Sequence, residues 1–172
     1  MVPVARPANA PLVLLGHGGG LHKKTPAQAA RARDMVTSWG CHVAAVDALR
    51  QLPGIGPDAP VGYGGGISLG TAIGVPLTAA EPRITAAIFG GGFFVFPAQI
   101  EAARRITVPV QFLLPWDDEH VDRQSALALF DAFAAKEKTL HANPGDHRTI
   151  RWTGVDDEFL PRHLGRLGTS PA

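Results

Sequence analysis

The sequence predicts an α/β fold with a largely parallel sheet, and three observations support this prediction. Short apolar runs alternate with segments of helical periodicity along the whole chain. Glycine clusters follow several of the apolar runs, as happens where buried strands turn into helices at the carboxyl edge of a parallel sheet. The length of 172 residues, 45% of them hydrophobic and 18% charged, suits one compact domain and leaves no room for a second. We expect about six mostly parallel strands with helices on both faces.

The first third of the chain contains two predicted strands and one predicted helix. Residues 11–15 are a short apolar run, read as a buried strand. Thr25 is suited to cap a helix over residues 27–38, and residues 42–46 form the next apolar run. Residues 47–60 include five glycines and prolines, which leave space for only about one turn of helix.

The middle of the chain continues the alternation. A third strand begins at residues 61–63 and runs into a glycine cluster. Residues 71–80 predict a helix, although its interior contains a glycine and a proline. Residues 84–89 predict a fourth strand, and residues 97–105 a further helix.

The last third predicts two strands and two helices. Residues 108–114 form the fifth apolar run and residues 138–141 a sixth, shorter one. Residues 123–136 have the strongest amphipathic pattern in the chain, and residues 156–164 predict a final helix. We expect the strong helix to bury one face, formed by Leu127, Phe130 and Ala134 and widened by Leu129 and Phe133.

Composition excludes several classes of protein. The formal net charge is +1 and no basic stripe occurs, so we expect no nucleic-acid partner. The single cysteine cannot form an internal disulfide, and no cysteine or histidine spacing predicts a zinc site. The apolar runs are too short for a signal peptide or a membrane span, so we expect a cytoplasmic protein with no membrane partner. The predicted domain covers residues 11–166, between an N-terminal extension (1–10) and a C-terminal tail (167–172).

Residues 66–70 read Gly-Ile-Ser-Leu-Gly and fit the pattern G-x-S-x-G at a predicted strand-to-helix turn. A serine nucleophile must stand clear of the sheet on a sharp turn, and flanking glycines allow such a turn without side-chain clashes. Ser68 is therefore the candidate nucleophile. The alternative is an ordinary turn in which Ser68 only caps the following helix.

A second glycine cluster follows the first predicted strand and includes His17 and Gly19. A tetrahedral acyl intermediate requires backbone N–H donors directed at its oxyanion, and glycine-rich turns expose such donors. We expect one donor from Leu69, which follows the serine, and the other from Gly19. The alternative is a glycine turn in which His17 only fills space.

A serine nucleophile requires a base, and the base requires a carboxylate that orients it. Four histidines follow the serine, namely His120, His141, His147 and His163. His147 is favoured because it lies on a turn after the sixth predicted strand, at the carboxyl edge of the sheet. Asp118, after the fifth strand, is the favoured acid and Asp117 the reserve. A solvated, helix-capping acidic turn is the alternative for this cluster.

These motifs together resemble the α/β-hydrolase superfamily, and within it most closely the dienelactone-hydrolase-like esterases. The resemblance rests on residues 14–20 (LLGHGGG), 66–70 (GISLG), 116–119 (WDDE) and 141–147 (HANPGDH). It implies a reduced α/β-hydrolase fold and a Ser68–Asp118–His147 triad, with the oxyanion held by Leu69 and Gly19. Asp118 and Val121 reproduce the Asp-x-x-Val spacing of these esterases.

The chain departs from these relatives in the shortened crossover before the nucleophile strand, where residues 47–60 replace a full helix. The edge strands that often precede the glycine–histidine loop in these relatives are also missing or reduced. We therefore expect either a minimal hydrolase with an open site, or a homodimer in which a second copy covers the bare sheet face. His17, Phe93 and Trp116 are the candidate substrate-binding residues; core packing is the alternative for Phe93, and anchoring of its loop for Trp116.

The sequence therefore predicts a serine esterase for small, short-chain esters, with no cofactor and no metal. Two alternatives stay open. One is a degenerate hydrolase fold that serves as a binding or assembly module without catalysis. The other is a nucleotide-binding protein, although the glycine cluster at 64–70 lies after the third strand and lacks the acidic residue that a dinucleotide site needs.

Overall fold

A computed structural model describes residues 12–15, 42–44, 60–65, 67–91 and 95–165. Its sheet has the strand order β2-β1-β3-β4-β5-β6, and all neighbouring strands are parallel. The strands are β1 (Leu12–Leu15), β2 (His42–Ala44), β3 (Val61–Gly64), β4 (Ile84–Gly90), β5 (Val110–Pro115) and β6 (Lys138–Asn143). The helices are α2 (Leu69–Ala80), α3 (Pro97–Ala103), α4 (Arg123–Ala132) and α5 (Phe159–His163). The predicted α/β class with a parallel sheet is confirmed.

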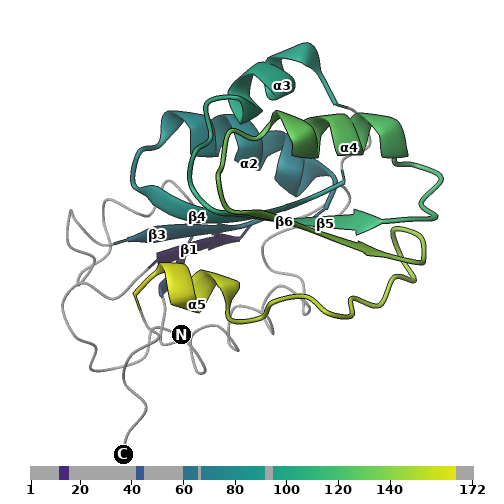
Figure 1. Cartoon of the computed structure of the whole chain (residues 1–172). Helices are drawn as coiled ribbons and strands as arrows, with labels where there is room; N and C mark the ends of the chain where they lie inside the picture. The colour runs from purple at the N-terminus through teal and green to yellow at the C-terminus, as the bar shows by residue number, and fades with distance from the viewer. Residues whose placement is uncertain (1–11, 16–41, 45–59, 66, 92–94, 166–172) are drawn as a thin grey trace, which may run out of the picture.

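Helices lie on both faces of the sheet in the described part of the chain. Figure 1 shows α2, α3 and α4 on one side and α5 on the other. The alternation of side chains in β4 explains the two layers, because Ala87 and Phe89 belong to the core under the three helices whereas Ala86 and Ile88 contact the α5 side. Phe159 and Leu160 of α5 complete this smaller second core.

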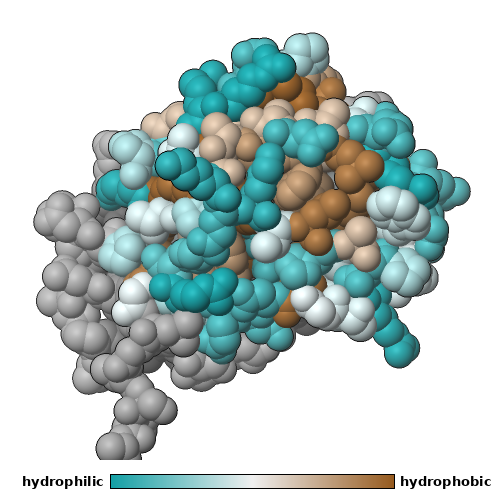
Figure 2. Space-filling view, viewed as in Figure 1, coloured by the Kyte–Doolittle hydropathy of each residue, from teal (hydrophilic) through white to brown (hydrophobic). Residues whose placement is uncertain are grey.

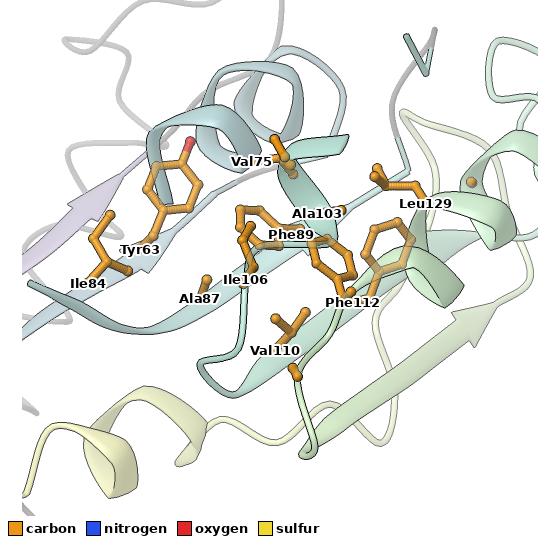
Figure 3. Close-up of a cluster of buried hydrophobic side chains, with 14 of the residues drawn as sticks. Tyr63, Val75, Ile84, Ala87, Phe89, Ala103, Ile106, Val110, Phe112 and Leu129 are labelled. Atoms are coloured by element: carbon orange, nitrogen blue, oxygen red, sulfur yellow. The ribbon is translucent and has the colours of Figure 1, made fainter. Parts of the chain in front are cut away.

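Aromatic side chains fill the larger core (Figure 3). The rings of Phe89 and Phe133 stack with centroids 5.3 Å apart, and Phe112 lies 6.1 Å from Phe133. Tyr63 contacts this group through Phe89, with ring centroids 5.6 Å apart. Residues from β3, β4, β5 and the end of α4 therefore meet in one aromatic cluster beneath the helices.

Tyr63 connects β3 to the first turn of α2. Its ring points from the strand toward the helix in Figure 3, and its hydroxyl donates a hydrogen bond of 2.6 Å to the carbonyl oxygen of Gly70. Gly74 makes room for the ring, since a Cβ at that position would lie 2.2 Å from Cε1 of Tyr63. Burial raises the pKa of Tyr63 to about 12. The glycine in the interior of the predicted helix is thus a packing requirement of the buried tyrosine.

Several element boundaries differ from the prediction, among them α5, which covers Phe159–His163 and not 156–164, and two of the differences have identifiable reasons. β5 begins at Val110 because Pro109 cannot donate to a sheet ladder. α4 ends at Ala132, four residues before the predicted end, because Phe133 is extended. The ammonium group of Lys138 donates hydrogen bonds to the terminal carbonyl oxygens of Phe130, Asp131 and Phe133 at 2.9–3.1 Å, which satisfies the end of the helix.

The buried face of α4 also differs from the prediction. Ala126 and Leu129 are fully buried, whereas the predicted Leu127 and Phe130 are only partly buried and Ala134 is exposed. Leu127 and Phe130 still pack against the core, and Phe133 is buried, so the prediction for this face was wrong only at Ala134, which the early end of the helix removes from the face.

Several predicted elements lie outside the described residues. These are the helix at 27–38, the single turn within 47–60, the glycine cluster at 16–20 and both terminal segments. No helix of the described part is both long and apolar enough to cross a membrane.

Candidate active site

Ser68 lies at a sharp turn between β3 and α2. Its backbone has φ 70° and ψ −124°, in the region that favours glycine, and it is the one non-glycine residue with positive φ in the described ranges. Such a conformation costs on the order of 1–3 kcal/mol and persists only where the surroundings enforce it. The turn is the strand-to-helix elbow that the G-x-S-x-G pattern predicts.

Contacts with the end of β4 enforce this turn. The Ser68 N–H donates to the carbonyl oxygen of Gly91 at 2.8 Å, and Thr71 Oγ1 accepts from the Gly90 N–H at 2.7 Å. Ile67 packs directly on Gly90, since a Cβ there would lie 2.3 Å from Cγ2 of Ile67. Gly90, the last residue of β4, therefore lets the neighbouring turn approach the sheet closely.

Asp118 lies in the loop that follows β5, which we call the acid loop (residues 116–121). Its side chain is fully buried and accepts two hydrogen bonds, one at Oδ1 from the His120 N–H and one at Oδ2 from Nδ1 of His147, both at 2.9 Å. A carboxylate can only accept, so Nδ1 of His147 carries a proton, and in the neutral imidazole Nε2 is then the acceptor. Asp118 thereby fixes the tautomer that a general base needs.

Val121 closes the acid loop against the neighbouring strand. Its N–H donates to the carbonyl oxygen of Asp118 at 3.3 Å, and its side chain is 6% exposed. A Cβ on Gly91 would lie 3.0 Å from Cγ1 of Val121. Because Gly91 also accepts from Ser68, one residue connects the serine turn with the acid loop.

His147 lies on the loop that follows β6, which we call the histidine loop (residues 144–150). Gly145 has φ +123°, and a Cβ there would lie 2.9 Å from Cα of Ile150, so both conformation and space require glycine. Asp146 Oδ1 accepts from the N–H groups of Arg148 and Thr149 at 2.7 and 2.9 Å. These backbone bonds, that of Arg148 first, hold the pKa of the Asp146 carboxyl below its usual value. The loop is a closely bonded turn that presents His147, whose side chain is 20% exposed.

The structure brings some of the predicted residues together. Asp118 and His147 form a hydrogen-bonded pair, and the turn of Ser68 leaves the same edge of the sheet because β3, β5 and β6 are parallel. The Ser68 hydroxyl is buried and has no hydrogen-bond partner among the described residues. Leu69 is the first residue of α2, where backbone N–H groups have no acceptor within the helix.

The other predicted candidates are placed as follows. Asp117 bonds to the backbone of Gly145 and not to the histidine ring. His163 pairs with Glu137 at 3.0 Å in α5, and His141 lies within β6. Gly19, His17 and Phe93 lie outside the described residues.

Trp116 is 39% exposed, and the guanidinium of Arg123 lies 4.1 Å from the centroid of its ring. Arg123 also donates to the carbonyl oxygen of Trp116 at 2.6 and 3.2 Å. The sequence did not predict this cation–π pair, because an arginine at the start of a helix, seven residues after a tryptophan, is not a distinctive pattern. Within the described ranges no group of three or more histidine, cysteine or acidic residues could hold a metal ion.

Comparisons with known proteins find similarity among solved structures. No protein-family model matches the chain, and no curated protein matches it. Among solved structures, it is similar to a cold-adapted esterase from an Arctic intertidal metagenomic library, with 30% identity and a TM-score of 0.71 over 86% of this chain and 78% of that one. It also shares its fold with the esterase domain of a Rhodothermus marinus protein, with 16% identity and a TM-score of 0.61 over 86% and 81% of the two chains. The Pyrococcus furiosus esterase Pf2001 shares the fold as well, with 10% identity and a TM-score of 0.66 over 82% and 76%.

Proposed function

The chain belongs to the esterases of the α/β-hydrolase type, and on this premise we propose that it cleaves small carboxylic esters through an acyl-enzyme on Ser68. The observation that carries the proposal is the buried Asp118–His147 pair at the sheet edge where the strained Ser68 turn also lies. A serine hydrolase requires a carboxylate that is hydrogen-bonded to its imidazole base, whereas a serine that only capped a helix would require no such pair.

The proposed reaction has two halves. Ser68 Oγ attacks the ester carbonyl carbon while Nε2 of His147 takes the hydroxyl proton, and the C–O bond to the alcohol then breaks as His147 returns this proton to the leaving oxygen. Water next attacks the acyl carbon with His147 again as base, which releases the acid and restores the serine hydroxyl. Asp118 holds the imidazole and stabilises its charged form.

The Leu69 N–H and the Gly19 N–H are the proposed oxyanion donors. The position of Leu69 at the start of α2 supports this role, because the positive end of a helix dipole and unpaired N–H groups favour a developing negative charge. The removal of one such donor typically lowers kcat about a hundred- to a thousandfold.

Apolar surface beside the serine supports a small ester as substrate. Figure 2 shows hydrophobic side chains at the surface on the side of the molecule that carries α2 and α4. Leu69 and Ile73 are 41% and 56% exposed and lie one helical turn apart directly after Ser68. Such surface suits the alkyl part of a short-chain ester. We propose Trp116, with His17 and Phe93, as the further substrate contacts.

The finer parts of the proposal come from the sequence motifs. They favour the dienelactone-hydrolase-like esterases within this fold, with no requirement for a cofactor. A homodimer would cover the sheet face that we expect the short crossover at 47–60 to leave without a full helix.

Active-site labelling tests the proposal directly. A fluorophosphonate probe should label the protein at Ser68, and hydrolysis of p-nitrophenyl butyrate should fall at least about a hundredfold in Ser68→Ala and comparably in His147→Ala. Ser125→Ala is the matched serine control, because Ser125 lies in the first turn of α4, where its N–H donates to the capping Asp122. His163→Gln is the matched histidine control, because His163 also pairs with a carboxylate. Both controls should keep wild-type activity. A folded protein that neither labels nor turns over ester would support a binding module instead.

A further inference from the structure

We infer that Asp117 is a positioning residue that holds the histidine loop in register with the acid loop. This inference rests on the proposed function, in which His147 is the base. Asp117 directly precedes Asp118, and either carboxylate could be the acid on sequence alone. The structure gives the two neighbours different partners: Asp118 is buried against the imidazole, whereas Asp117 is exposed and, within the described part of the chain, bonds to main-chain atoms of Gly145.

The bonds between Asp117 and Gly145 are reciprocal. The Asp117 N–H donates to the carbonyl oxygen of Gly145 at 3.3 Å, and Asp117 Oδ2 accepts from the Gly145 N–H at 3.0 Å. One residue of the acid loop therefore satisfies both the donor and the acceptor of one peptide residue in the histidine loop. A charged acceptor makes the second bond stronger than a neutral one of the same length.

This pair extends the strand ladder beyond the sheet. Within the sheet Pro115 is opposite Asn143, and the Trp116 N–H then donates to the carbonyl oxygen of Asn143 at 2.8 Å. The Asp117–Gly145 pair is the next hydrogen-bonded connection between the segments that follow β5 and β6. The side-chain oxygen of Asp117 takes the place of a main-chain acceptor at the point where Gly145, with φ +123°, turns the chain away from a strand.

The consequence is geometric. Asp118 lies one residue after Asp117, and His147 lies two residues after Gly145. The reciprocal Asp117–Gly145 bonds, which we call the main-chain clamp, therefore fix the two backbone segments that carry the proposed acid and base. On the far side of the loop, the side chain of Asn143 makes a second reciprocal pair with Thr153, at 3.0 and 3.2 Å. Small displacements of a catalytic group reduce turnover strongly, which gives a main-chain clamp a kinetic role.

The test compares two substitutions at one position. Asp117→Asn keeps a carbonyl oxygen that can accept from the Gly145 N–H, whereas Asp117→Ala removes it. We expect kcat for p-nitrophenyl butyrate to fall about tenfold in Asp117→Ala with KM within about twofold of wild type, and to stay within about threefold of wild type in Asp117→Asn. Asp118→Asn, which removes the proposed acid, should lose about a thousandfold or more. Asp157→Ala is the matched control, because Asp157 is also an exposed loop aspartate and should leave kcat unchanged.

Hydrogen–deuterium exchange gives a second readout that does not depend on turnover. A peptide that covers residues 144–150 should exchange faster in Asp117→Ala and at the wild-type rate in Asp117→Asn. Wild-type kcat in Asp117→Ala would overturn the inference, and so would a loss in Asp117→Asn as large as that in Asp118→Asn, which would make Asp117 the acid. A rise in KM alone would also overturn it, because Asp117 would then contact substrate. If Ser68→Ala keeps wild-type turnover, the proposed function fails, and the exchange experiment still decides whether Asp117 holds the loop.

Discussion

Tyr63 is the only tyrosine of the chain, so its ionisation can be followed without interference from another phenol. It is 3% exposed, and burial raises its pKa to about 12 from an ordinary value of about 10. The buried ring therefore resists losing its proton. We predict that the tyrosinate absorbance of the folded protein does not develop with the midpoint near pH 10 that an exposed tyrosine shows.

The same difference predicts how stability depends on pH. The unfolded chain loses the phenolic proton above about pH 10, whereas the folded chain keeps it until about pH 12. The stabilising contribution is therefore fully present below pH 10 and is lost as the pH rises toward 12. Each pH unit of difference corresponds to about 1.4 kcal/mol, so the free energy of unfolding should fall by roughly 3 kcal/mol across this interval.

Denaturant unfolding followed by tryptophan fluorescence measures the loss, with pH 8 below both pKa values as the reference and pH 10 and 11 within the interval that they define. Tyr63→Phe is the matched variant, because it keeps the ring and removes only the titrating hydroxyl. It should cost about 1–2 kcal/mol at pH 8, where the hydrogen bond to Gly70 is lost, and should then lack most of the alkaline decrease. A folded wild-type protein whose tyrosine titrates near pH 10, or a variant with the same alkaline decrease as wild type, would refute the reasoning.

Three further substitutions test other contacts. Gly74→Ala should destabilise the protein by about 1–3 kcal/mol in denaturant unfolding, although alanine favours helices, because its Cβ would lie 2.2 Å from the Tyr63 ring; a stabilised variant would contradict this packing. Gly145→Ala should lower kcat about tenfold, because positive φ and the 2.9 Å approach to Ile150 would displace the histidine loop; unchanged kinetics would mean that the loop adapts. Lys138→Met should cost about 1–2 kcal/mol in thermal or denaturant unfolding, because three carbonyl oxygens at the end of α4 lose their donor; a change below a few tenths would mean that water replaces it.

Much of the fold could be predicted because the signals are local. Apolar runs followed by glycines predict strands that turn into helices, and the boundaries of β4 and α3 agree with the prediction to within two residues. The end of α4 could not be predicted, because Lys138 belongs to the next strand and satisfies the helix from outside. Periodicity continues through Ala134, whereas the chain has already become extended at Phe133.

The sequence predicted which loops carry the candidate site residues. The G-x-S-x-G pattern located the turn of Ser68, and the structure reproduces the positive φ that such an elbow requires. The distinction between Asp117 and Asp118 could not be made from composition, since the two residues are identical and adjacent. Burial and partners separate them, and both depend on a loop that lies almost thirty residues further along the chain, at His147.

The backbone of Ser68 has a consequence for how this protein could change over generations or in a directed-evolution experiment. Glycine would relieve the positive φ at this position without a clash, whereas it would remove the hydroxyl. A screen that rewards only heat resistance or high expression would therefore favour mutants that have lost the proposed nucleophile. A screen that also demands ester turnover would retain Ser68 with its strained backbone and would select stabilising mutations elsewhere in the molecule.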